Sequence, residues 1–305
     1  MNLSLKNKKP EITTDDRKKQ AAAKSSVLAA FGLVAMKAVV GILTGSLGIL
    51  AEALHSGLDL VAALVTWFAV RISSKPADRE HLYGHGKYEN VSALFETLLL
   101  LITCIWIIHA AVMRLTGKEV HIIVNAWSFL VMAISIIVDI SRSRMLFKAA
   151  KKYNSQALEA DALHFSTDIW SSAVVIFGLL CVAVSDWFPH LAFLRYADAV
   201  AAILVGIIVI GVSWKLGVRT VRVLLDSAPV GLEDQIIRVA EAVPGVLNCH
   251  HVRLRSSGAQ IFVDMHVLMD GGKSLRDAHR LTEEIEKAIR GISPDADVTV
   301  HPEPK

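Results

Sequence analysis

The chain has 305 residues and a mass of 33.2 kDa, and 53% of its residues are hydrophobic, with a mean hydropathy of +0.47. This composition is too apolar for a soluble globular protein. Only 20% of the residues are charged, and 32 Lys and Arg against 29 Asp and Glu give a net charge of +3, which excludes an acidic disordered chain and a basic nucleic-acid-binding protein.

Six apolar segments follow a polar, basic N-terminus. A helix needs about 20 apolar residues to cross the hydrocarbon of a bilayer. The segments lie at 25–47, 49–72, 91–115, 122–141, 160–184 and 196–216. We therefore predict an all-α bundle of six transmembrane helices in a lipid bilayer, with a very short turn between the first two. The first segment is too long for a signal peptide, so we expect it to remain in the mature protein.

The distribution of Lys and Arg between the loops predicts the orientation. The two ends of this region and the loops on their side hold 19 of these residues, whereas the loops on the opposite side hold three. Because positive loops stay on the cytoplasmic side, both termini are expected in the cytoplasm. Short loops and the lack of eukaryotic targeting motifs favour a bacterial inner membrane.

The composition becomes polar after Asp226, which predicts a separate cytoplasmic domain. Its periodicity indicates helix, strand, strand, helix and strand at 231–242, 247–256, 259–269, 274–290 and 296–301. This α-β-β-α-β order is typical of a small ferredoxin-like α+β sheet. The predicted domains are a disordered N-terminus (1–24), the membrane domain (25–226) and the cytoplasmic domain (227–305).

Two matching polar pairs interrupt the apolar segments. His55 and Asp59 in the second segment, like His164 and Asp168 in the fifth, are four residues apart and lie on one helix face. If the helices face each other, two imidazoles and two carboxylates converge, which suits tetrahedral Zn²⁺. Metal and protons would compete for these side chains. The alternative is a pair of structural interhelical hydrogen bonds. We interpret Lys37, in the first segment, as a snorkelling side chain.

The two pairs, the segment from Thr44 to His55 (TGSLGILAEALH) and the C-terminal α-β-β-α-β pattern resemble the cation diffusion facilitator family over nearly the whole chain. The resemblance implies a homodimeric, proton-coupled exporter of divalent transition metals, and not an enzyme. It implies that the two His-Asp pairs form the transport site. His55, in place of an aspartate, suggests a preference for Zn²⁺ over Cd²⁺, Co²⁺, Ni²⁺, Fe²⁺ or Mn²⁺.

The resemblance also implies peripheral sites. Asp78, His81 and His85 match a zinc site in the loop after the second segment, and a solvated polar loop is the alternative. Lys87 and Asp226 match an interlocking ion pair. In the C-terminal domain, which would bind metal and dimerise, the implied ligands of regulatory Zn²⁺ are His250, His266, His279, His301 and Glu303, although Pro302 departs from the family pattern. Scattered surface histidines are the alternative there.

Two other classes of protein use polar residues inside a membrane. A metallohydrolase needs an open coordination position and a general base, and the sequence has no HExxH motif. A passive metal channel uses rings of charge along a pore. Both remain alternatives to an exchanger at this stage.

Overall fold

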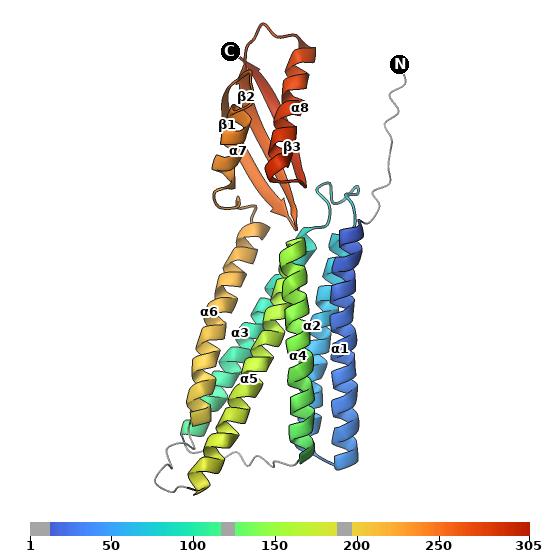
Figure 1. Cartoon of the computed structure of the whole chain (residues 1–305), viewed down its shortest axis with the longest axis vertical. Helices are drawn as coiled ribbons and strands as arrows, with labels where there is room; N and C mark the ends of the chain where they lie inside the picture. The colour runs from blue at the N-terminus through green and yellow to red at the C-terminus, as the bar shows by residue number, and fades with distance from the viewer. Residues whose placement is uncertain (1–12, 117–125, 188–196) are drawn as a thin grey trace.

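The computed structural model describes residues 13–116, 126–187 and 197–305 (Figure 1). Within these residues, six long helices form an elongated bundle, and a small α+β domain stands at one end of it. The helices are α1 (Thr14–Thr44), α2 (Leu47–Ser73), α3 (Lys87–Leu115), α4 (Ala126–Tyr153), α5 (Gln156–Trp187) and α6 (Ala197–Leu224). The predicted fold class, a helical membrane bundle followed by an α-β-β-α-β domain, is confirmed.

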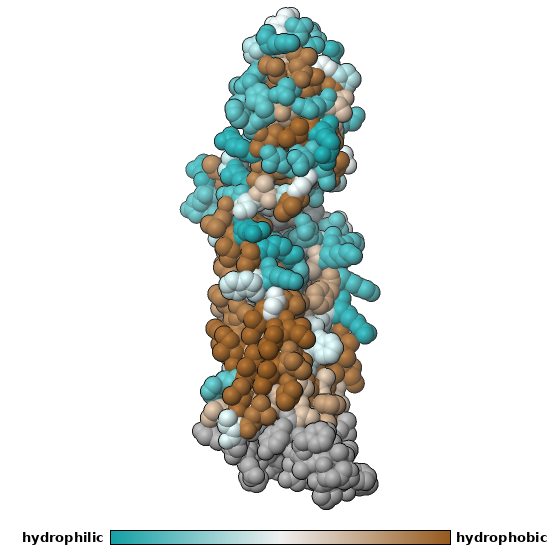
Figure 2. Space-filling view, turned by 90° about the vertical axis from the view of Figure 1, so that its left-hand side faces the viewer, coloured by the Kyte–Doolittle hydropathy of each residue, from teal (hydrophilic) through white to brown (hydrophobic). Residues whose placement is uncertain are grey.

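The surface of the bundle is apolar over much of its length. Figure 2 shows hydrophobic side chains covering its middle, whereas hydrophilic ones gather over the α+β domain and the adjoining end of the bundle. Among the described residues, four helices contain a stretch long and apolar enough to cross a membrane, namely α1, α2, α3 and α6. Helices α4 and α5 pack against each other and against these four. The chain is a multi-pass membrane protein.

Helix α1 begins earlier than the sequence indicated. Thr13 caps it and forms a capping box with Asp16, so that the first backbone N–H groups have partners. Residues 14–24, which we expected to be disordered, are therefore helical. Residues 1–12 of the predicted disordered segment lie outside the described residues.

Helix α4 also extends further than predicted. We assigned 142–152 to a loop because of its basic residues, but the helix continues to Tyr153. Arg142 is buried in the bundle, where its Nη1 lies 3.6 Å from Asp139 Oδ1 and its Nη2 donates to Ser26 Oγ at 3.0 Å. Because a carboxylate and a hydroxyl partner its charge, Arg142 lies within the helix and faces the interior of the bundle. Residues 122–125 of the predicted fourth segment lie outside the described residues.

The turn between α1 and α2 is very short, as predicted. Only Gly45 and Ser46 separate the two helices, and Gly45 adopts a left-handed conformation (φ 65°) that favours glycine. Ser46 then caps α2. The two helices form a hairpin whose turn lies at the end of the bundle away from the α+β domain (Figure 1).

The α+β domain has its own core. Helices α7 (Leu232–Glu241) and α8 (Leu275–Ile292) pack on one face of a sheet in the order β1-β2-β3, formed by β1 (Val246–Ser257), β2 (Gln260–Met269) and β3 (Ala296–Pro304). Strand β2 pairs antiparallel with β1 and parallel with β3. Val263, Met265 and Val267 enter the core, so His266 lies on the opposite face of β2.

Candidate functional site

The described polar cluster at the centre of the bundle joins α2 to α5. Asp59 Oδ1 lies 3.1 Å from His164 Nε2, and the same nitrogen lies 3.8 Å from Asp168 Oδ2. One ligand atom from each residue lies within 4.8 Å of the other two. Asp59 and His164 are buried, and the Asp168 side chain is about one-fifth exposed, at 21%. Three of the four predicted transport-site residues therefore converge.

His55 stands apart from this group. It is half-buried on α2, one turn before Asp59, but its ring nitrogens are not within the 4.8 Å limit that joins the other three residues. The i and i+4 spacing puts it on the Asp59 face of α2. The structure thus places His55 next to the cluster but outside the group of mutually close ligand atoms.

Further buried polar groups line the bundle interior near this cluster. Asp161 Oδ2 accepts a hydrogen bond of 3.2 Å from Ser26 Oγ on α1, and the Glu96 carboxyl on α3 is hydrogen-bonded to Thr66 on α2. Asp161 and Glu96 are both fully buried. Neither residue is among the ligands predicted from the sequence. A polar interior of this kind is typical of an ion pathway through a membrane protein.

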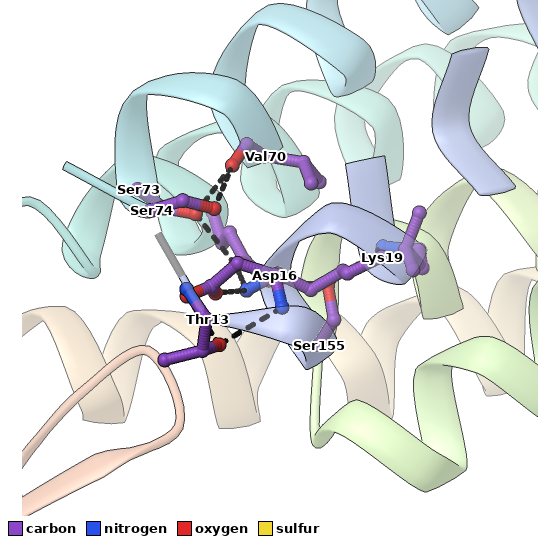
Figure 3. Close-up of polar contacts among 9 residues, drawn as sticks. Thr13, Asp16, Lys19, Val70, Ser73, Ser74 and Ser155 are labelled. Carbon is purple, nitrogen blue, oxygen red and sulfur yellow. Dashed lines mark hydrogen bonds and ion pairs between the residues drawn. The ribbon is translucent and has the colours of Figure 1, made fainter. Parts of the chain in front are cut away.

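A second polar network closes the end of the bundle next to the α+β domain. Lys19 Nζ on α1 lies 2.6 Å from Glu89 Oε1 on α3, and Ser73 on α2 donates to the same oxygen at 2.7 Å. Ser155, just before α5, donates to the other carboxylate oxygen. Lys19, Ser73 and Ser155 are labelled in Figure 3. One buried carboxylate thus holds four segments together, which sequence spacing did not indicate.

The loop between α2 and α3 brings its three predicted ligands together. Asp78 Oδ1 lies 3.4 Å from His81 Nδ1, and Asp78 Oδ2 lies 3.3 Å from His85 Nε2. The His85 ring is fixed on its other side, where Nδ1 lies 3.1 Å from the carbonyl oxygen of Pro76. Hydrogen bonds from the backbone N–H groups of His81 and Glu80, together with the nearby histidines, lower the pKa of Asp78. An ionised carboxylate with two imidazoles is a donor set that fits Zn²⁺.

Four of the five predicted ligands of the α+β domain form a row across the sheet. His250 on β1 pairs in register with His266 on β2, which pairs with His301 on β3. Glu303 contacts two of them: Oε1 lies 2.7 Å from His266 Nδ1, and Oε2 lies 3.1 Å from His250 Nε2. The hydrogen bond from His266 and the nearby histidines lower the pKa of Glu303. These donors also fit a zinc ion in type and number.

Two residues of this domain differ from expectation. His279 lies on α8, where its Nε2 is 3.5 Å from Glu283 Oε1, and it belongs to neither group of ligands found within the described chain. His251, which we did not select, lies within ligand distance of His250 and His266. The reason is a register shift in β1 after His250, with φ of 50° at His251, so that neighbouring residues no longer alternate between the faces. Period-2 alternation cannot reveal such a bulge.

The remaining predicted pair lies where the bundle meets the α+β domain. Lys87 Nζ at the start of α3 is 2.8 Å from Oδ1 of Asp226, two residues after α6, and 3.4 Å from the carbonyl oxygen of Leu224. Asp226 has a positive φ of 59°. This ion pair joins the start of α3, directly after the loop of Asp78 and His85, to the C-terminal end of α6.

A helical membrane bundle with a buried carboxylate-imidazole cluster, followed by a domain with a histidine-lined sheet, defines the class of metal-transporting membrane proteins. Comparison with known proteins identifies the family. Residues 23–225 match the family described as "Cation efflux transmembrane domain", and residues 229–305 match "Cation efflux protein, cytoplasmic domain". The chain belongs to the cation diffusion facilitator family, a family of divalent metal exporters.

Two relatives that match most of the chain are bacterial. The cation-efflux pump FieF of Yersinia enterocolitica is 31% identical over 288 residues, which cover 93% of this chain and 92% of the relative. FieF of Yersinia pestis (strain Pestoides F) is 32% identical over the same length and coverage. A solved structure of the MamM C-terminal domain in a nickel form is 28% identical and covers 24% of this chain and 95% of that domain, with a TM-score of 0.23.

Proposed function

We propose that this protein is a proton-coupled antiporter that exports Zn²⁺ from the cytoplasm. The observation that carries the proposal is the buried cluster of Asp59, His164 and Asp168, contributed by two helices at the centre of a membrane bundle. Two carboxylates balance the charge of a dication. We propose that His55, one turn from Asp59, becomes the fourth ligand when metal binds.

Proton coupling follows from the chemistry of these ligands. Without metal, two carboxylates in the bundle interior would carry uncompensated charge, which is costly away from water. Protons relieve that cost, and metal must displace them in order to bind. Metal and protons therefore occupy the site in alternation.

The ligand set favours zinc among divalent metals. Two imidazole nitrogens with two carboxylate oxygens match the tetrahedral coordination that Zn²⁺ adopts in proteins. A site for Mn²⁺ would use more oxygen ligands in an octahedral arrangement. We therefore place zinc first, ahead of Cd²⁺, Co²⁺, Ni²⁺, Fe²⁺ and Mn²⁺.

Several further assignments belong to the same proposal. The asymmetry of Lys and Arg between the two ends of the bundle supports cytoplasmic termini, and bacterial relatives support the inner membrane. We propose a homodimer joined through the α+β domains, in which the row of His250, His266, His301 and Glu303 binds regulatory Zn²⁺. The donor set of Asp78, His81 and His85 supports a third metal site, in the loop.

Flux measurements in proteoliposomes test this function. Vesicles that contain the purified protein and a zinc-sensitive dye are given equal zinc on both sides and a pH gradient across the membrane. An antiporter accumulates zinc against its own gradient, and a protonophore abolishes the accumulation. Zinc that only equilibrates down its gradient indicates a channel, and absence of flux contradicts both transport mechanisms.

A further inference from the structure

Lys37 is a buried charge that the proposed mechanism does not use. We interpreted it from the sequence as a snorkelling residue, and that interpretation is wrong: Lys37 is only 5% exposed and lies against α2. Its Nζ donates to Ser56 Oγ at 2.8 Å and lies 3.2 Å from Glu52 Oε2. The long side chain turns toward the neighbouring helix because two oxygen acceptors are available there.

These partners place the ammonium group beside the transport site. Glu52, Ser56 and Asp59 are four and three residues apart, so they lie on one face of α2. Ser56 is one turn from Asp59, an offset of about 4.5 Å along the helix axis. Lys37 lies on the side of Asp59 that faces the turn between α1 and α2, away from the α+β domain (Figure 1).

A cation at this position acts directly on a bound dication. Charges within one or two helical turns of each other in a protein interior interact strongly, because little water screens them. The Glu52 side chain offsets part of the lysine charge, but Glu52 is seven residues before Asp59, about 10.5 Å along the helix axis, whereas the ammonium group contacts Ser56, three residues before Asp59. The net effect of the pair at Asp59 is repulsion of the metal.

We propose that Lys37 supplies a built-in positive charge that weakens metal binding at the transport site and so accelerates release of the metal. The inference rests on the proposed transport function. It adds a residue that lowers the metal affinity of the transport site and thereby raises the rate of transport. A carrier that bound a dication through two carboxylates without such a charge would release it slowly.

The alternative is that the Lys37–Glu52 pair only joins α1 to α2. Two variants separate these roles, because both break the same ion pair but change the charge in opposite directions. Lys37→Met removes the cation, and Glu52→Gln removes the anion while keeping a polar side chain of the same shape. Lys24→Met is the matched control, since it removes a lysine from an exposed position of the same helix.

The measurement is the initial rate of proton-driven zinc flux in proteoliposomes as a function of zinc concentration. We expect Lys37→Met to lower KM by roughly tenfold and to reduce the maximal rate, because the metal leaves more slowly. Glu52→Gln should raise KM, because the lysine charge is no longer offset. The double variant should return toward the wild-type KM, and Lys24→Met should leave it unchanged.

The outcomes distinguish this inference from the proposed function. If the wild-type protein moves no zinc, the transport function itself is wrong. If the wild type transports zinc but the two variants shift KM in the same direction, or neither shifts it, the pair is structural and the inference is overturned. If Lys37→Met does not fold, the direction of the Glu52→Gln shift decides: an increase in KM supports the electrostatic role, and an unchanged or lower KM contradicts it.

Discussion

The guanidinium carbon of Arg255 lies 3.5 Å from the centre of the Tyr83 ring, which joins the β1–β2 hairpin to the loop between α2 and α3. Tyr83 also packs edge-on against Phe262 of β2, with ring centroids 5.1 Å apart. Beside them, Gly86 lies directly on the backbone of Ser257 and Gly258. The loop that carries Asp78 and His85 is therefore held to the α+β domain of the same chain.

Gly86→Ala should loosen this contact. A Cβ at this position would overlap the carbonyl oxygen of Ser257, and backbone cannot move aside as a flexible side chain can. We expect the full-length protein in detergent to lose about 1–3 kcal/mol of stability, seen as a lower melting temperature. Gly32→Ala, where an added Cβ meets nothing within 4 Å, is the control. Equal melting temperatures for the two variants would argue against a tight contact.

Asp168→Ala should abolish transport. The change removes one of two carboxylates that balance the metal charge, and loss of one partner from a buried charged group costs about 3–5 kcal/mol. This corresponds to more than about a hundredfold loss of metal affinity. Zinc flux in proteoliposomes measures the effect, with the exposed Asp297→Ala as control. Proton-driven flux at the wild-type rate in well-folded Asp168→Ala protein would remove this residue from the transport site.

His55→Asp should broaden metal selectivity while zinc still binds. The substitution exchanges an imidazole nitrogen for a harder carboxylate oxygen and adds negative charge one turn from Asp59. The ratio of zinc to cadmium flux at equal concentrations measures the change, and it should differ from the wild-type ratio. An unchanged ratio would mean that His55 does not coordinate the metal.

Zinc should promote association of the isolated 227–305 domain, which has its own hydrophobic core. Ligands at a shared interface bind the associated state better, so metal shifts the equilibrium toward it. Substituting both His266 and His301 with Ala should weaken the response. Asp264→Ala, two residues before His266 on the same face, should preserve it. Sedimentation with and without zinc tests this, and association that does not depend on zinc would contradict a regulatory role.

The thermal stability of the metal-free α+β domain should depend on Glu303 at neutral pH but not at acidic pH. Its pKa is lowered from 4.5 in the folded domain, first by the hydrogen bond from His266. A lowered carboxyl pKa contributes stability above the unfolded value, and this contribution disappears as pH falls through the folded value. Glu303→Gln should therefore melt at a lower temperature than wild type near neutral pH. In chelator-treated samples the difference in melting temperature between the two proteins should narrow as the pH falls below 4.5. A difference that does not change with pH would contradict the stabilising role of the ionised Glu303.

The sequence by itself determined the local features of this protein. Hydrophobic periodicity and segment length identified the helices of the bundle and every element of the α+β domain, because these depend on neighbouring residues. The repeated spacing of His55 with Asp59 and His164 with Asp168 marked the centre of the bundle for the same reason.

Only the tertiary structure decided which distant groups meet. The contact of Glu89 with Lys19, which is 70 residues away in the chain, depends on how four segments pack, and no local pattern encodes it. Lys37 illustrates the same limit. A lone lysine in an apolar segment suggested a snorkelling residue, and only the tertiary structure shows that its ammonium group contacts the oxygens of Ser56 and Glu52. The register shift in β1 brought His251 to the face that carries His250 and His266, because a single bulge reverses the alternation from which the sequence is interpreted.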